Sequence, residues 1–245
     1  MKKLLFVLLP VILLMIIPHA YAMEYIPYLG FTLPKNPQIC ILNNTNEAKY
    51  YNVTQTAINL WTILLDGYTN SHNWDIKLKI TDNEHKVNCD IVFNYDLETH
   101  DWSQDGGKIF GKPQLWRELG VTTVDPKLSF IEIKIHTLYR NNSEILPVIT
   151  HEFGHGMGLG HRMGNTGTSM VAAFLSYDIM FPWMKKGEWI TDDDIKALIN
   201  LYGTQGWHDG FKIPNSYIIT HPTKIVVYCN GQNSTNGLCY NYFSP

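Results

Sequence analysis

The stretch HEFGHGMGLGH, residues 151–161, contains three histidines, one glutamate and four glycines. Residues four positions apart lie on the same face of an α-helix, so His151 and His155 project side by side and can bind one metal ion. Glu152 lies one step round the helix, where its carboxylate can take a proton from a water that the metal activates. The stretch therefore predicts a metal site with two histidine ligands and a neighbouring base.

The glycines explain how a third histidine reaches the same ion. A glycine weakens a helix by about 1 kcal/mol relative to alanine, and a helix that simply continued would carry His161 away along its axis. Gly158 and Gly160 permit a left-handed backbone that turns the chain back. Three neutral histidines with one open position are typical of a catalytic zinc site, because structural sites normally close all four positions. The predicted zinc ligands are therefore His151, His155 and His161.

The sequence before this stretch predicts a helix followed by several strands. Apolar residues recur every three or four positions from residue 47 to residue 65, which indicates a long amphipathic helix. A period of two indicates half-buried strands, at residues 74–80, 89–95 and 131–135, with a further strand near Ile109 and Phe110. The sheet therefore precedes the histidines in the sequence.

A second helix carries the histidines. Asn142 or Ser143 can cap this helix, which should run to about residue 157. Pro147 falls in its first turn, where a missing N–H loses no intrahelical bond.

A third helix is predicted after Thr191, whose side chain can cap it. The aspartates at 192–194 complement the positive end of its dipole, and Gly203 ends it. The order of one helix, strands, a helix, a loop and a helix indicates an α+β domain.

Residues 1–22 have the features of a secretory signal peptide. Lys2 and Lys3 precede an apolar run over residues 4–17, and Ala20-Tyr21-Ala22 supplies small residues for cleavage. A membrane anchor is the alternative, but the run is shorter than the roughly 20 residues of a spanning helix, and Pro10 interrupts it. We therefore expect a secreted, extracellular chain.

Charge and cysteine content limit the partners and the compartment. The formal net charge of −3 offers no basic field, so we expect neither nucleic acid nor a membrane as partner. We also expect the chain to be a monomer. All four cysteines follow the signal segment and predict disulfides in an oxidising compartment. Four cysteines allow three connectivities. The local guess pairs Cys229 with Cys239, and Cys40 with Cys89 would then link two predicted strands.

The pattern H-E-x-x-H-x-x-G-x-x-H resembles that of the metzincin metallopeptidases, and HEFGHGMGLGH is most similar to the matrixins, which include the matrix metalloproteinases. The resemblance implies a zincin-like catalytic domain over residues 23–203, with a twisted, mostly parallel sheet and three main helices. It also implies a zinc endopeptidase acting on polypeptides, with zinc on the three histidines and Glu152 as general base.

Residues 177–182, YDIMFP, resemble the matrixin turn that holds a methionine beneath the zinc. Met180 is the counterpart of that methionine, and Phe181 and Pro182 would form part of the pocket for the residue after the scissile bond. Astacins and serralysins carry a tyrosine two residues after the methionine, and Pro182 occupies that position here. The resemblance therefore favours the matrixins and predicts no tyrosine ligand.

Two regions depart from the family. Matrixins of animals also carry structural zinc and calcium, but the loop at 96–112 reproduces only scattered elements of those sites. His100, Asp101 and Asp105 could bind a second ion, although no clear motif supports one. Residues 204–245, with Trp207, Tyr228 and the last two cysteines, could be a substrate-binding extension, but we expect a tail packed on the domain with one disulfide.

Two other functions stay open. A catalytically silent binding module could use the same scaffold, although Glu152 and all three histidines are intact. A zinc hydrolase of a non-protein amide is the second alternative, because the motif specifies amide hydrolysis better than substrate size. For a polypeptide, main-chain pairing along a sheet edge near residues 108–110 is expected.

Overall fold

A computed structural model describes residues 24–43, 47–96, 120–123, 130–136, 142–164, 178–181, 189–207 and 213–220. Its central feature is a five-stranded sheet, in the order β3 (Lys77–Thr81), β2 (Gln38–Leu42), β4 (Ile91–Asp96), β6 (Ile131–His136) and β5 (Gly120–Thr123). Neighbouring strands are parallel except β5, which runs antiparallel to β6 at the edge. The predicted α+β domain with a mostly parallel sheet is thus confirmed.

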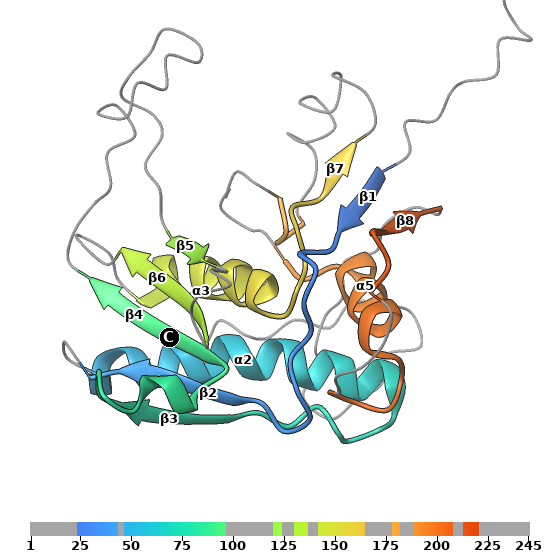
Figure 1. The fold of residues 1–245 in the computed structure, drawn as a ribbon. Helices are drawn as coiled ribbons and strands as arrows, with labels where there is room; N and C mark the ends of the chain where they lie inside the picture. Colours follow the sequence, from blue (N-terminus) through green and yellow to red (C-terminus); the bar gives the residue numbers. More distant parts are fainter. Residues whose placement is uncertain are drawn as a thin grey trace, which may run out of the picture.

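Two helices, α2 (Glu47–Thr69) and α3 (Asn142–Gly156), lie side by side against one face of this sheet (Figure 1). Alternate strand residues point toward them and form the main core with the apolar stripe of α2. The fully buried members include Ile39, Ile91, Phe93, Ile133, Ala57 and Trp61. The helix with the histidines is therefore fixed on a rigid surface.

A smaller apolar cluster covers part of the opposite face and contains a disulfide. Cys40 on β2 is bonded to Cys89, which precedes β4, as the sequence analysis predicted. The other cluster members are Leu42, Val92 and Phe130. The disulfide thus links two neighbouring parallel strands on the face away from the helices.

The predicted elements match the structure with differences that have physical reasons. α2 runs four residues past the predicted end at residue 65, and the strands expected at 89–95 and 131–135 appear as β4 and β6. β3 begins only at Lys77, and Ile80 is 47 % exposed, because the strand lies at the edge of the sheet. The strand expected near Ile109 and Phe110 lies outside the described residues.

Pro147 was predicted in the first turn of α3, and this is wrong. The helix begins at Asn142, so Pro147 is its sixth residue. The missing N–H of a proline at that position removes a bond to the carbonyl four residues earlier. Burial of the inner face of α3 against the sheet keeps the helix continuous despite this loss.

A second, three-stranded antiparallel sheet lies beside the last helix. Its order is β7 (Met163–Gly164), β1 (Glu24–Pro27) and β8 (Ser216–Ile219), and α5 (Asp192–Tyr202) contacts β8 (Figure 1). β1 thus pairs on one side with β7, which follows His161, and on the other side with β8, which lies after residue 204.

The described part of the extension after residue 203 packs on the domain. Trp207 is buried, its ring contacts the rings of Trp74 and Tyr202, and its Nε1 donates to the Trp74 carbonyl at 2.9 Å. Several predictions fall outside the described residues: the signal peptide, the pairing of Cys229 with Cys239, Tyr228, and His100, Asp101 and Asp105.

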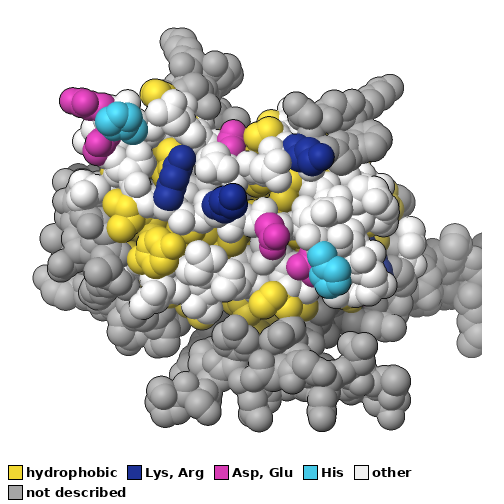
Figure 2. Space-filling view, turned by 90° about the horizontal axis from the view of Figure 1, so that it is seen from below, with side chains coloured by type: hydrophobic (Ala, Val, Ile, Leu, Met, Phe, Trp, Pro, Cys, Tyr) yellow, Lys and Arg dark blue, Asp and Glu magenta, His cyan; other side chains and the backbone are white. Residues whose placement is uncertain are grey.

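The face seen in Figure 2 carries basic and acidic side chains, with apolar side chains gathered in several places between them. Over the described part of the chain, exposed large apolar residues include Ile80 and Val87. No helix within the described ranges is long and apolar enough to span a membrane.

Removal of the Cys40–Cys89 disulfide should lower the free energy of unfolding by about 2–4 kcal/mol, because it closes a long loop in the unfolded chain. The two cysteines are 49 residues apart. Urea denaturation of Cys40→Ala/Cys89→Ala against oxidised wild type measures the change. The Cys229→Ala/Cys239→Ala variant, compared oxidised and reduced, is the matched control, because only Cys40 and Cys89 remain in it and both keep their sulfur atoms. Unchanged transition midpoints in both samples would contradict the prediction.

Candidate metal centre

The turn after α3 carries His161 back to the two helical histidines. Gly158 has a φ of 100°, the left-handed conformation that the sequence analysis predicted. Gly160 was expected to be left-handed as well, and this is wrong. Its lack of a side chain serves a close approach instead, because a Cβ there would lie 2.6 Å from Cγ of Pro27. The turn is therefore packed directly against the end of β1.

The three histidines bring their Nε2 atoms together in a small triangle. The Nε2 atom of His155 lies 3.1 Å from that of His151 and 3.1 Å from that of His161, and the third edge is 3.2 Å. Nitrogens bound tetrahedrally to one zinc ion would lie about 3.3 Å apart. A metal ion needs several His, Cys, Asp or Glu side chains close together. Within the described ranges, these three histidines are the one such group.

Backbone carbonyls determine which ring nitrogens carry protons. The Nδ1 atom of His151 lies 2.5 Å from the Ile179 oxygen, and that of His155 lies 2.7 Å from the Leu159 oxygen. A carbonyl only accepts, so both Nδ1 atoms donate and both Nε2 atoms carry a lone pair. Two lone pairs that face each other at 3.1 Å repel unless a cation lies between them. The arrangement therefore fits a metal ion.

Burial keeps the three imidazoles in the form that binds metal. Loss of solvent lowers the pKa of His151 well below its usual value, and the neighbouring His155 acts in the same direction. Burial also lowers the pKa of His155, and it lowers the pKa of His161 to about 4. Neutral imidazoles need not lose a proton before they bind a metal.

Met180 packs against α3 beside the histidines. Its side chain is fully buried, and a Cβ at Gly154 would lie 2.3 Å from its sulfur, so the sulfur occupies the space that glycine leaves. The preceding residue, Ile179, provides the carbonyl that orients His151. Phe181 is also buried, whereas Pro182 lies outside the described residues. Residues 178–181 thus support the histidine helix.

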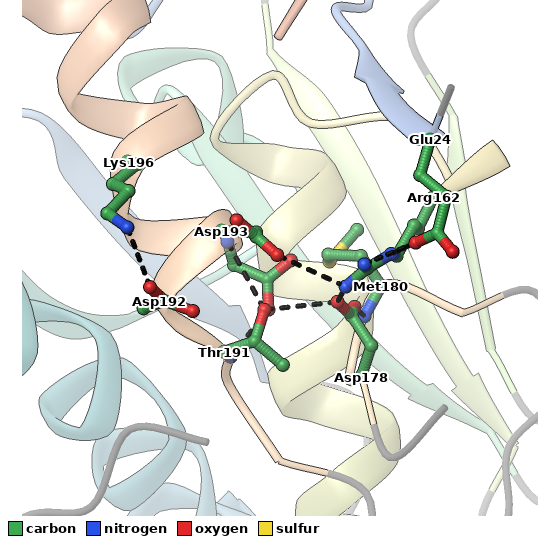
Figure 3. A network of polar contacts seen from close by, with 9 residues as sticks. Glu24, Arg162, Asp178, Met180, Thr191, Asp192, Asp193 and Lys196 are labelled. Atoms are coloured by element: carbon green, nitrogen blue, oxygen red, sulfur yellow. Dashed lines mark hydrogen bonds and ion pairs between the residues drawn. The ribbon is translucent and has the colours of Figure 1, made fainter. Parts of the chain in front are cut away.

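A buried arginine next to the third histidine was missed by the sequence analysis. Arg162 is 7 % exposed, and its guanidinium donates to Oδ2 of Asp178 at 2.6 Å. It lies 3.5 Å from Oδ2 of Asp193 and also donates to the Glu24 carboxylate on β1 (Figure 3). An arginine directly after His161, with a run of aspartates downstream, is the signal that could have suggested this pairing.

Asp178 connects this arginine to the methionine turn and to α5. Its Oδ1 accepts from the Met180 N–H at 2.8 Å, and its Oδ2 accepts from the Thr191 hydroxyl at 3.0 Å. The Arg162 N–H in turn donates to the Met180 carbonyl at 2.9 Å. One carboxylate therefore joins the loop after α3, the methionine turn and the start of α5 (Figure 3).

The start of α5 combines the predicted cap with unexpected burial. Thr191 caps the helix in a reciprocal capping box with Asp194, and Gly203 ends it, as predicted. All three aspartates are buried, however, and burial together with the Asp178 charge raises the pKa of Asp194 well above its usual value. Their role therefore extends beyond the helix dipole to the charge network.

Glu152 belongs to α3, and its side chain contacts β5, the edge strand of the sheet. Its side chain is buried, and its Oε2 lies 2.7 Å from the hydroxyl oxygen of Thr122 on β5. The sequence analysis did not identify Thr122, because GVTT is too short to show an alternation. A buried carboxylate thus lies next in sequence to the first histidine of the cluster.

Comparison with known families finds one match that spans the elements of the site. A family model described as matrixin matches residues 39–203, about two thirds of the chain, from β2 to the end of α5. No curated protein matches the chain.

Replacing His161 by alanine should weaken zinc binding by at least about tenfold, because it removes one of three converging ligands. Competition with a chromophoric chelator measures the affinity. His72→Asn is the matched control, since His72 lies outside the cluster and asparagine tolerates its φ of 51°. Equal zinc affinities for His161→Ala and wild type would rule out His161 as a ligand.

Proposed function

This chain belongs to the matrixin family of metallopeptidases, and on that premise we propose that it is a secreted zinc-dependent endopeptidase. The proposed zinc ligands are His151, His155 and His161, and Glu152 is the proposed general base. The observation that carries the proposal is the convergence of three Nε2 atoms within 3.2 Å, with a buried glutamate next in sequence to His151.

The donor set suits a catalytic zinc ion. Three protein ligands leave one position open, and neutral imidazole is a preferred zinc ligand. When bound there, zinc would supply Lewis-acid chemistry for activating water and polarising a carbonyl. The carbonyls of Ile179 and Leu159 orient two of the rings, so the protein sets the ligand positions itself.

Glu152 performs the proton transfers in the proposed mechanism. Its carboxylate would take a proton from a water molecule, and the resulting hydroxide would attack the scissile carbonyl carbon. The same carboxyl group delivers the proton to the leaving amine nitrogen as the peptide bond breaks. General acid–base catalysis of this kind contributes about 10²- to 10⁴-fold to the rate.

The proposed substrate is an extended polypeptide that pairs with β5. This strand is the terminal strand of the five-stranded sheet and contacts α3. The outer edge of such a strand carries main-chain donors and acceptors that an extended peptide can bind. The edge expected earlier, near residues 108–110, lies outside the described residues, so β5 takes this role in the proposal.

Secretion rests on the first 22 residues and on the disulfide. The Cys40–Cys89 bond is typical of proteins that fold in an oxidising compartment. The proposal therefore includes removal of residues 1–22 and activity outside the cell.

Glu152→Gln should reduce peptide cleavage by at least about 10²-fold, because glutamine keeps the size of the side chain and removes the base. Zinc content and thermal stability should stay near wild type. The measurement is the rate of cleavage at each site of a peptide library, by wild type and variant, with and without chelator.

Three outcomes of that experiment would count against the proposal. Near-normal cleavage by Glu152→Gln would rule out the base. Loss of zinc from this variant would assign Glu152 a structural role instead. A zinc-loaded wild-type protein that cleaves no peptide would contradict the endopeptidase and leave the two alternatives, a silent binding module and a hydrolase of a non-protein amide.

A further inference from the structure

The hydroxyl of Thr122 lies close to two atoms of Glu152. Its Oγ1 is 2.7 Å from the carboxylate Oε2 and 3.0 Å from the backbone oxygen of the same residue. Thr122 lies on β5, about thirty residues before Glu152 in the sequence, so only the fold brings them together. Thr122 is neither one of the proposed zinc ligands nor a member of the hydrophobic core, so its contact with Glu152 needs a separate explanation.

The sheet register explains why Thr122 points toward α3. Thr122 is directly opposite Ile133 on β6, and residues opposite each other in an antiparallel pair share a face. Ile133 is fully buried in the core that the helices cover. Thr123 therefore projects to the other face of the sheet, and it is exposed.

The carboxylate is the better of the two acceptors for the Thr122 hydroxyl. A hydroxyl has one proton and cannot donate to both oxygens at once. A helical carbonyl already accepts from the N–H four residues later, whereas a bond to a carboxylate is charge-assisted and stronger. The shorter distance is also the one to Oε2.

We infer that Thr122 is a positioning residue that fixes the carboxylate of Glu152 for proton transfer. This inference rests on the proposed role of Glu152 as the base. A glutamate side chain has three rotatable bonds. When its carboxylate leaves the orientation that suits proton transfer, the catalysed reaction is slower. The hydroxyl of Thr122 holds one carboxylate oxygen from the sheet side and so restricts those rotations.

The position of Thr122 also connects substrate binding to the base. The backbone of β5 is the proposed docking edge, and a side chain of the same four-residue strand contacts Glu152. Main-chain pairing by a peptide would immobilise this strand. The substrate would thereby stabilise the orientation of the group that acts on it.

The test compares Thr122→Val, which removes only the hydroxyl, with Thr122→Ser, which keeps it. We expect Thr122→Val to lower kcat by about 10- to 100-fold, with KM changed less than about threefold and zinc content equal to wild type. Thr122→Ser should restore most of kcat. Thr56→Val is the matched control, because the Thr56 hydroxyl donates only within α2, to the Asn52 carbonyl at 2.8 Å.

A structural readout tests the inference independently of activity. Crystal structures of the zinc-loaded wild type and Thr122→Ser should show the Glu152 carboxylate in one orientation, which Thr122→Val should displace or split. An unmoved carboxylate in Thr122→Val, or an unchanged kcat, would overturn the inference. If the wild type cleaves no peptide, the proposed function fails, and the carboxylate positions alone decide the role of Thr122.

Discussion

The buried ion pair between Arg162 and Asp178 is the interaction on which the candidate metal centre depends. Burying two opposite charges lowers stability unless both are well hydrogen-bonded. Here the guanidinium also contacts two further carboxylates, and Asp178 also accepts from a backbone N–H and a hydroxyl. Arg162 directly follows His161, and Asp178 lies two residues before Met180. One pair therefore fixes the third histidine of the cluster relative to the turn that supports the histidine helix.

The same network explains how segments far apart in the chain produce one site. β1 contributes Glu24, the loop after α3 contributes Arg162, and α5 begins with the residues that surround Asp178. Carbonyls of the neighbouring turns orient the rings of His151 and His155. The protein thus sets the ligand positions through its own packing, which lowers the reorganisation needed when a metal binds.

The sequence predicted those parts of the site that depend on local geometry. His151 and His155 converge because helical spacing alone places them on one face, and the turn at Gly158 needs only a left-handed residue. The contacts of Arg162 and Thr122 could not be predicted, because their partners come from strands and helices distant in sequence. Gly160 was misread for a related reason, since its neighbour Pro27 lies more than a hundred residues away.

The zinc dissociation constant of Arg162→Lys tests the central claim most directly. Lysine keeps the positive charge, so the aspartates stay compensated, but it lacks the fork that contacts several carboxylates at once. The account predicts weaker zinc binding, by about tenfold or more, together with a lower free energy of unfolding. A variant that binds zinc as tightly as wild type and unfolds at the same denaturant concentration would show that this pair does not hold the metal centre.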